Sequence, residues 1–378
     1  MRNIILWPWQ LPDGPELRPV AVANPAIETL WVPHAASPQE PHAEVTYVDL
    51  ILRVIESVPD AAAAILSPRA AQGSGKIVID RFAPEDVDQS DPRLIRMRDG
   101  HGIRLPSISH LRRVRLDAAG ALVMVGEVIL PDTTQYEIFG KEDPSVTWLD
   151  GTPWLSYVGV SDWGVTPVLA RGKQGPNGWV YERVAEAQGH HDNRDVKILP
   201  VRPGGLLWRH DRVNTQPWGP KRMTWATSPD EGKSWSSSRP LMAGRHAWER
   251  MHVGSGAVPF PCAAPDGRPA LASYYHGVHP EAGAVAGCYQ TGLAYFDAEA
   301  PDRELARLPE PVLTAWANDA FERERRAVCP LDEPTFQARH GLFVIPRVVF
   351  TTGHARVGQD QWLFSGVNDI CIERTVLR

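Results

Sequence analysis

The sequence has few cysteines and lacks a long apolar run, and each shortage argues against a class of protein. No cysteine belongs to a CxxC pair, so we expect neither a disulfide framework nor a cysteine-based zinc site; the four are Cys262, Cys288, Cys329 and Cys371. No apolar stretch approaches the roughly 18 to 20 residues of a membrane-spanning helix, and the first residues do not resemble a secretory signal. We therefore expect a cytoplasmic protein.

A strong excess of one charge is also missing. The chain has 39 lysines and arginines against 45 aspartates and glutamates, a formal net charge of -6, so neither nucleic acid nor a membrane is an expected partner. Walker, GxGxxG, HExxH and GxSxG motifs are absent, which removes local support for nucleotide, zinc-protease and serine-hydrolase chemistry. His190, His191 and His252 have no metal-ligand spacing, so we predict no metal.

Turn-forming residues and tryptophan are abundant instead: the chain has 35 Pro, 31 Gly and 14 Trp. Amphipathic helical patterns are scarce, and the best one, residues 319–326, is short and highly charged, which predicts a helix or turn on the rim. Elsewhere, short β-branched and aromatic runs end at Gly, Pro, Asp or Asn, as antiparallel strands do. We predict an all-β protein in which most tryptophans pack in the core and exposed rings are available to stack on sugars.

One pattern recurs along the chain, a Gly-bearing turn followed by a strand of alternating apolar residues. It occurs at residues 150–160, 204–210, 266–278 and 361–367. The spacing of roughly 50 to 60 residues is of the order of a four-stranded propeller blade. Residues 228–235 also fit the SxDxGxxW turn of propeller blades, in which the Asp bonds the turn backbone and the Trp packs beneath. We predict a single domain, residues 1–378, with insertions near 56–74 and 298–334.

The richest polar segment contains two adjacent carboxylates, Glu142 and Asp143, directly before Pro144. Because side chains alternate along an extended strand, we expect one carboxylate to face the blade axis and the other to pair with a neighbour such as Lys141. Taken alone, an Asp before a proline is more typical of a turn cap than of a catalytic acid.

Together with these residues, several landmarks resemble glycoside hydrolase family 130, the β-mannoside phosphorylases and β-mannosidases. The signature Glu-Asp-Pro follows Gly140 and Lys141, although Ser145 stands where the family has Arg. The other landmarks occur in family order; they are Asn24-Pro25-Ala26, Leu52-Arg53-Val54, Arg194-Asp195-Val196, Asp211-Arg212, Tyr275-His276-Gly277-Val278 and Gly366-Val367-Asn368-Asp369. The resemblance implies a five-bladed β-propeller.

The resemblance also implies the roles of individual residues. Asp143 would be the catalytic acid, whose proton reaches the glycosidic oxygen through a sugar hydroxyl, while inorganic phosphate attacks the opposite face of the anomeric carbon. The residues expected to bind phosphate are Arg53, Arg194, Arg212 and His276. Substrate contacts are expected from Asn24, Glu142, Asp195, Tyr275 and Asp369. The Trp-rich rim, which includes Trp154, Trp163, Trp179 and Trp218, departs from the family, and it leaves the substrate open because rim loops choose the leaving group.

Three functions remain open from the sequence. The first is an inverting phosphorylase that cleaves a β-linked mannoside or related glycoside to an α-sugar 1-phosphate, with phosphate as co-substrate and no cofactor. The second is an inverting β-mannosidase in which paired carboxylates activate water. The third is a propeller that binds glycans without turnover. The sugar, its linkage and the oligomeric state stay undetermined, although exposed blade edges would permit a homo-oligomer.

Overall fold

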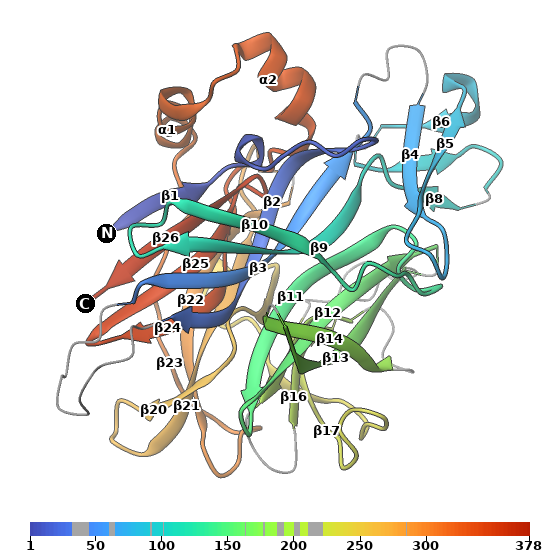
Figure 1. Ribbon diagram of the computed structural model, residues 1–378. Helices are drawn as coiled ribbons and strands as arrows, with labels where there is room; N and C mark the ends of the chain where they lie inside the picture. Colours follow the sequence, from blue (N-terminus) through green and yellow to red (C-terminus); the bar gives the residue numbers. More distant parts are fainter. Residues whose placement is uncertain are drawn as a thin grey trace.

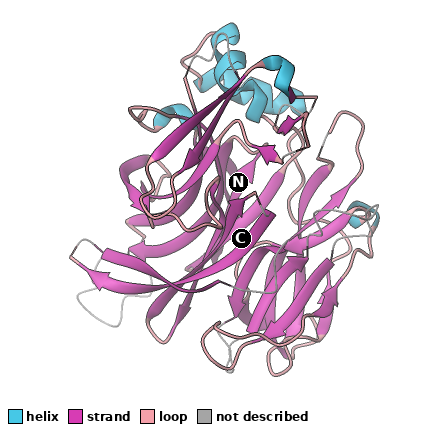
Figure 2. Cartoon of the chain, turned by 90° about the vertical axis from the view of Figure 1, so that its right-hand side faces the viewer, coloured by secondary structure: helices cyan, strands magenta, loops and turns pink. Residues whose placement is uncertain are grey.

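The computed structural model describes residues 1–31, 45–59, 65–90, 93–100, 102–162, 164–176, 178–186, 193–199, 205–210, 222–284 and 286–378. This part of the chain is mostly β, as predicted, with most of the helical segments gathered at the top of the view in Figure 2 and a short helical turn at its right. None of the helices in the described ranges is long and apolar enough to cross a membrane.

Within the described residues, most strands form five antiparallel units with four strands in sequence, one of which has an additional strand, and the remaining strands form two small sheets. The first unit comprises β2 (Arg18–Trp31), β3 (Tyr47–Ser57), β9 (Ile108–Asp117) and β10 (Leu122–Ile129). The second comprises β11 (Gly140–Leu149), β12 (Thr152–Ser161), β13 (Gly164–Gly175) and β14 (Gly178–Glu186). One parallel pair, Gly140 with Ser109, joins these two units into a single sheet.

The remaining units repeat this arrangement. The third comprises β15 (Asn193–Leu199), β16 (Gly205–His210), β17 (Arg222–Thr227) and β18 (Arg239–Met242). The fourth comprises β19 (His252–Ser255), β21 (Pro269–His279), β22 (Cys288–Asp297) and β23 (Glu304–Arg307), and β20 (Phe260–Ala263) also pairs with β21. The fifth comprises β24 (Val349–Val357), β25 (Asp360–Val367), β26 (Cys371–Leu377) and β1 (Arg2–Leu6). Because β1 pairs with β26, the two ends of the chain complete one sheet (Figure 1).

The predicted repeat corresponds to the second strand of a unit. β12, β16, β21 and β25 match its four copies, and each pairs with the first strand of its own unit. The SxDxGxxW turn joins β17 to β18, where Asp230 accepts the backbone N–H of Ser234 at 2.8 Å and the Trp235 indole donates to the Gly232 carbonyl at 2.9 Å. Its predicted structural role is therefore confirmed.

The two predicted insertions differ from their expected bounds. The first is larger than residues 56–74, because all of residues 58–107 lies between β3 and β9. It contains β4 (Ile65–Ala70), β5 (Ile77–Phe82), β6 (Val87–Asp88), β7 (Ile95–Met97) and β8 (Ile103–Arg104) and projects beside the first unit (Figure 1). We call residues 58–107 the arm.

The second predicted insertion, residues 298–334, begins inside a sheet, because β23 is the last strand of the fourth unit. The helices α1 (Asn318–Val328) and α2 (Glu333–His340) follow it. They are less solvated than expected, since Phe321 and Phe336 are buried in one cluster with Trp7. Short 3-10 turns occur at Pro8–Gln10, Pro84–Asp86, Ala247–Glu249 and Gly341–Phe343.

A buried ionic network holds the start of β11, the strand that carries Asp143. Glu137 is fully buried and accepts hydrogen bonds from the Tyr157 hydroxyl at 2.5 Å and from Arg183 Nη2 at 2.7 Å. Its carboxylate also lies 3.5 Å from Lys141 Nζ. Lys141 therefore pairs with Glu137, contrary to the prediction that it pairs with one of the two adjacent carboxylates.

Replacing Glu137 with alanine is expected to lower the free energy of unfolding by about 3 kcal/mol or more, because Lys141 and part of Arg183 lose their buried counter-charge. Denaturant unfolding would measure the loss. Glu182→Ala is the matched control, because Glu182 pairs with Lys173 on the exposed surface of the same sheet and such pairs contribute at most about 1 kcal/mol. Equal losses for the two variants would contradict the structural role of Glu137.

Candidate active site

A pocket of about 170 Å³ lies where the first strands of several units meet. Its described lining residues come from all five units and from the arm. They are Asn24, Arg53, Arg93, Asp143, Arg194, Asp195, Ala286, Tyr289, Ile345, Val348, Phe350 and Asp369. The pocket therefore collects Asn24, Arg53, Asp143, Arg194, Asp195 and Asp369 from the residues predicted for the site.

Four of these residues share an unusual backbone conformation, and three of the four lie at strand bulges. Asn24, Asp143 and Asp195 have φ values of 49°, 52° and 56°, in the left-handed region that Asn and Asp tolerate better than other side chains. Each lies where the pairing register of its strand shifts, in β2, β11 and β15. A bulge with a left-handed residue breaks the ordinary alternation and re-aims the side chain. A left-handed bulge thus directs one side chain toward the pocket from each of three units.

The bulge at Asp143 brings both adjacent carboxylates to the same arginines. Glu142 Oε1 lies 2.5 Å from Arg53 Nη2, and Glu142 Oε2 lies 3.0 Å from Arg194 Nη1. Asp143 approaches the same two guanidinium groups at 3.9 and 3.8 Å. Of the two carboxylates, only Asp143 lines the pocket while Glu142 pairs with neighbours, as predicted; the partners are Arg53 and Arg194 rather than Lys141, and both carboxylates reach the same arginines because the strand is not regular here.

Glu142 acts as a brace between two units rather than as a pocket wall. It is 5% exposed and is not among the lining residues, whereas the arginines that it joins come from β3 and β15. The Ser109 hydroxyl further orients Arg53 by accepting from its Nε at 3.0 Å. Charged groups held in this way need little reorganisation when an anion enters.

Asp369 occupies a tight turn between β25 and β26. Asn368 and Asp369 have φ values of 50° and 53°, and the Ile370 N–H donates to the Val367 carbonyl at 3.1 Å, which is the geometry of a type I′ hairpin turn. Burial raises the pKa of the Asp369 carboxyl to about 6, and the nearby charges of Asp143 and Glu142 add to the rise. Arg53 and Arg93 oppose it.

His276 and Tyr275 lie behind the pocket rather than in its described lining. His276 is fully buried on β21, where its ring packs against Phe350 and Tyr289 at centroid distances of 4.5 and 5.5 Å. Tyr275 points to the opposite side of the strand, into a cluster with Trp248, and its hydroxyl donates to Glu249. The structure therefore does not bring Tyr275 to the pocket, because neighbouring residues of a strand face opposite sides.

Comparison with known proteins gives a consistent result. No family model matches the chain. A β-1,2-mannobiose phosphorylase of Listeria innocua is 28% identical over 330 residues, which cover 85% of this chain and 82% of that protein. A 1,2-β-oligomannan phosphorylase of a Thermoanaerobacter species is 22% identical over 66% of this chain and 72% of its own length.

Solved structures of similar proteins have the same fold as this chain. The solved structure of the Listeria innocua enzyme, in complex with β-1,2-mannobiose, aligns with 99% of this chain and 94% of that one, with a TM-score of 0.75 and 22% identity. A GH130 structure, described with glycoside hydrolases that target β-1,2 mannosidic linkages in Candida mannan, covers 95% of this chain with a TM-score of 0.56 and 16% identity. The chain is thus similar in sequence to two phosphorylases of β-1,2-linked mannosides, and it shares its fold with solved structures that include a GH130 member.

Some GH130 landmarks and rim residues lie outside the described residues. Arg212, predicted for the phosphate site, is one of them, as are Trp163 and Trp218 of the predicted rim. Trp154 is buried in the cluster with Leu169 and Ala226, and Trp179 packs against the core of the second unit. The expected tryptophan lining is therefore not found among the described pocket residues, whose aromatic members are Tyr289 and Phe350.

Tyr289, Phe350 and Arg93 line the pocket but were not predicted from the sequence. Tyr289 follows Cys288 at the start of β22, and Phe350 lies at the start of β24. In the sequence, both are indistinguishable from other aromatic residues of strands. Arg93 lies in a polar loop of the arm. No local pattern marks these three side chains, because only the packing of distant segments brings them together.

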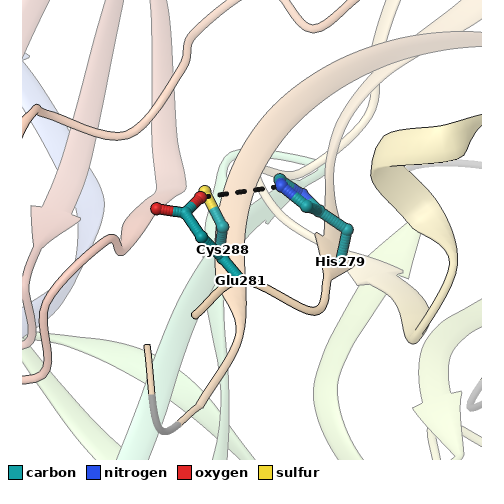
Figure 3. Close-up of side chains that lie close together, drawn as sticks. All are labelled: His279, Glu281 and Cys288. Carbon is teal, nitrogen blue, oxygen red and sulfur yellow. Dashed lines mark ion pairs between the residues drawn. The ribbon is translucent and has the colours of Figure 1, made fainter. Parts of the chain in front are cut away.

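A second group of polar side chains adjoins the pocket at the β21–β22 connection. His279, Glu281 and Cys288 each offer one atom that could bind a metal, and these three atoms lie within 4.8 Å of one another (Figure 3). The Arg347 guanidinium already donates two hydrogen bonds to the Glu281 carboxylate, at 2.5 and 3.1 Å. Burial raises the pKa of the Cys288 thiol to about 11. A bound guanidinium and a protonated thiol disfavour a cation here, so we interpret the group as an ion-pair network that fixes this connection.

Proposed function

We propose that the protein is an inverting β-mannoside phosphorylase, which cleaves a β-linked mannoside with inorganic phosphate and releases α-mannose 1-phosphate. The observation that carries the proposal is the pair Arg53 and Arg194, held on either side of Asp143 by Glu142. A phosphorylase needs an acid and an anion site next to each other. The names of the two similar enzymes, both phosphorylases of β-1,2-linked mannosides, support this choice and favour a β-1,2 linkage.

The proposed reaction uses one protein carboxyl. Asp143 supplies a proton to the glycosidic oxygen through a sugar hydroxyl, and a phosphate oxygen forms the new bond to the anomeric carbon as the bond to the leaving sugar breaks. Attack on the face opposite the leaving group inverts the anomeric carbon. Phosphate is already a nucleophile, so the reaction needs no second carboxylate to activate water and no organic cofactor.

Arg53 and Arg194 are proposed to bind the phosphate. Both present guanidinium forks at the pocket, and forks of this kind bind phosphate through two parallel hydrogen bonds. The arriving anion also offsets the positive charge beside Asp143, which favours the protonated form that an acid requires. Asn24, Asp195 and Asp369 line the same pocket and are proposed to contact sugar hydroxyls, while buried His276 supports Tyr289 and Phe350 from behind.

We infer further that the five four-stranded units are the blades of a five-bladed propeller around this pocket. The pairing of β1 with β26 would close the ring, as the last blade of a propeller is completed by the opposite end of the chain. The cytoplasmic location stays a prediction. A homo-oligomer is likewise undetermined and is not needed for the proposed chemistry.

The test is a product assay with and without inorganic phosphate on β-1,2-mannobiose. We expect cleavage to depend on phosphate and to yield mannose 1-phosphate, and we expect the reverse reaction to proceed from that donor. Without phosphate the rate should fall to a few per cent or less, because water lacks the binding energy that the arginines give to phosphate. Equal rates in both conditions, with free mannose as the only product, would favour a hydrolase, and no cleavage of any β-mannoside would favour a binding protein.

A further inference from the structure

The arm contributes a residue to the pocket that no landmark of the sequence indicated. Arg93 lies between β6 and β7, and it lines the pocket together with Arg53 and Arg194. Arg53 and Arg93 both act electrostatically on the carboxyl of Asp369. The lining of the pocket therefore places Arg93 at the site, close enough for its charge to act on the Asp369 carboxyl.

The arm is fastened to the β10–β11 connection and to the β12–β13 turn. The Ala70 N–H donates to the Ile138 carbonyl at 2.7 Å, just before β11, and the Gly73 N–H donates to the Thr133 carbonyl at 2.7 Å. Arg104 forms an ion pair with Asp162 in the β12–β13 turn. Ile95, two residues after Arg93, is fully buried. These contacts give the loop that carries Arg93 a fixed support.

The charges that line the pocket indicate what this third arginine could bind. Arg53 and Arg194 are engaged by Glu142 and lie near Asp143, so much of their charge is offset before any ligand binds. Asp195 and Asp369 add negative charge to the lining. An entering phosphate brings a further negative charge of between one and two, and a site of this balance needs an additional cation.

We propose that Arg93 is a phosphate-binding residue, supplied by the arm to the pocket formed by the sheets. The inference rests on the proposed phosphorolysis and deepens it. The arm would thus be part of the binding site for the nucleophile, and its loop would contact the ion that attacks the sugar. An arginine suits this role because its fork binds two phosphate oxygens, which a lysine does not.

The experiment measures the binding of inorganic phosphate by calorimetry to the unmodified protein, Arg93→Ala, Arg93→Lys and Arg96→Ala. We expect Arg93→Ala to weaken phosphate binding by about 10- to 100-fold, the usual effect of losing a charge-assisted fork. Arg93→Lys should bind with intermediate affinity, because it keeps the charge and loses the fork. Arg96→Ala is the matched control: Arg96 is an exposed arginine of the same arm that does not line the pocket.

Steady-state kinetics separate a phosphate contact from a sugar contact. Arg93→Ala should raise the KM for phosphate by a similar factor and leave the KM for the mannoside nearly unchanged. Unaltered phosphate binding in Arg93→Ala, or a rise confined to the mannoside KM, would overturn this inference and leave the phosphorylase intact. If the unmodified protein bound no phosphate and cleaved mannosides without it, both proposals would fail together.

Discussion

Replacing Asp143 with asparagine is expected to lower kcat for phosphorolysis by 100-fold or more. Asparagine keeps the shape of the side chain but has no proton to deliver to the glycosidic oxygen, and general acid catalysis typically contributes 10² to 10⁴-fold. The fold should survive, because asparagine accepts the left-handed φ of 52° at this position. Glu142 would still pair with Arg53 and Arg194. The measurement is steady-state kinetics together with a thermal unfolding curve.

A matched control lies at the other end of the same strand. Asp150 also has a left-handed backbone, with φ of 49°, but it belongs to the β11–β12 turn, away from the pocket lining. Asp150→Asn should therefore retain full activity. An active Asp143→Asn enzyme, or a variant that is inactive only because it unfolds, would return Asp143 to the role of a turn-capping residue.

The order of landmarks along the chain predicted much of the fold and the site. The Gly-bearing turns marked the second strands, because a turn followed by alternating apolar residues has the same appearance in every unit. The resemblance to GH130, rather than the repeat, indicated Arg53, Asp143, Arg194 and Asp369, and all four line one pocket.

The orientation of individual side chains was less predictable. Strand alternation correctly separates His276 from Tyr275, whose side chain faces the Trp248 cluster. The same rule holds only in part at Glu142 and Asp143, because a left-handed bulge lies between the regular parts of β11. A bulge is decided by backbone energetics over a few residues and by the strands on both sides, and no residue type marks it uniquely.

The arm shows a second limit of sequence reasoning. Its full extent, residues 58–107, exceeds the Pro- and Ala-rich part that drew attention to it. Arg93 is an exposed arginine in a polar loop, a setting in which most arginines contact only solvent. Its place at the pocket follows from backbone hydrogen bonds between the arm and residues 133–138, which are long-range contacts without a local signature.

Replacing Asp369 with asparagine is expected to make the protein more stable and less active. Between pH values of about 4 and 6, the folded protein holds a proton on Asp369 that the unfolded chain releases, because the folded pKa is about 6 and the ordinary value is 3.8. This group therefore lowers the free energy of unfolding as the pH rises through that window. Above it, the buried carboxylate costs about 2 to 3 kcal/mol, a cost that Asp369→Asn removes.

The gain should appear as a higher thermal midpoint at pH 7.5 that shrinks on acidification and vanishes below about pH 3, where Asp369 is protonated in the folded and unfolded states alike because its ordinary pKa is 3.8. Asparagine fits the left-handed turn, so no backbone strain offsets the gain. Asp360→Asn, in the neighbouring β24–β25 hairpin, is the control and should show no such pH-dependent gain. Activity should fall about 10- to 100-fold, since a charged acceptor for a sugar hydroxyl is lost. Phosphate binding should stay the same or tighten, because one negative charge has left the pocket; weaker phosphate binding, or a midpoint difference independent of pH, would contradict the role assigned to Asp369.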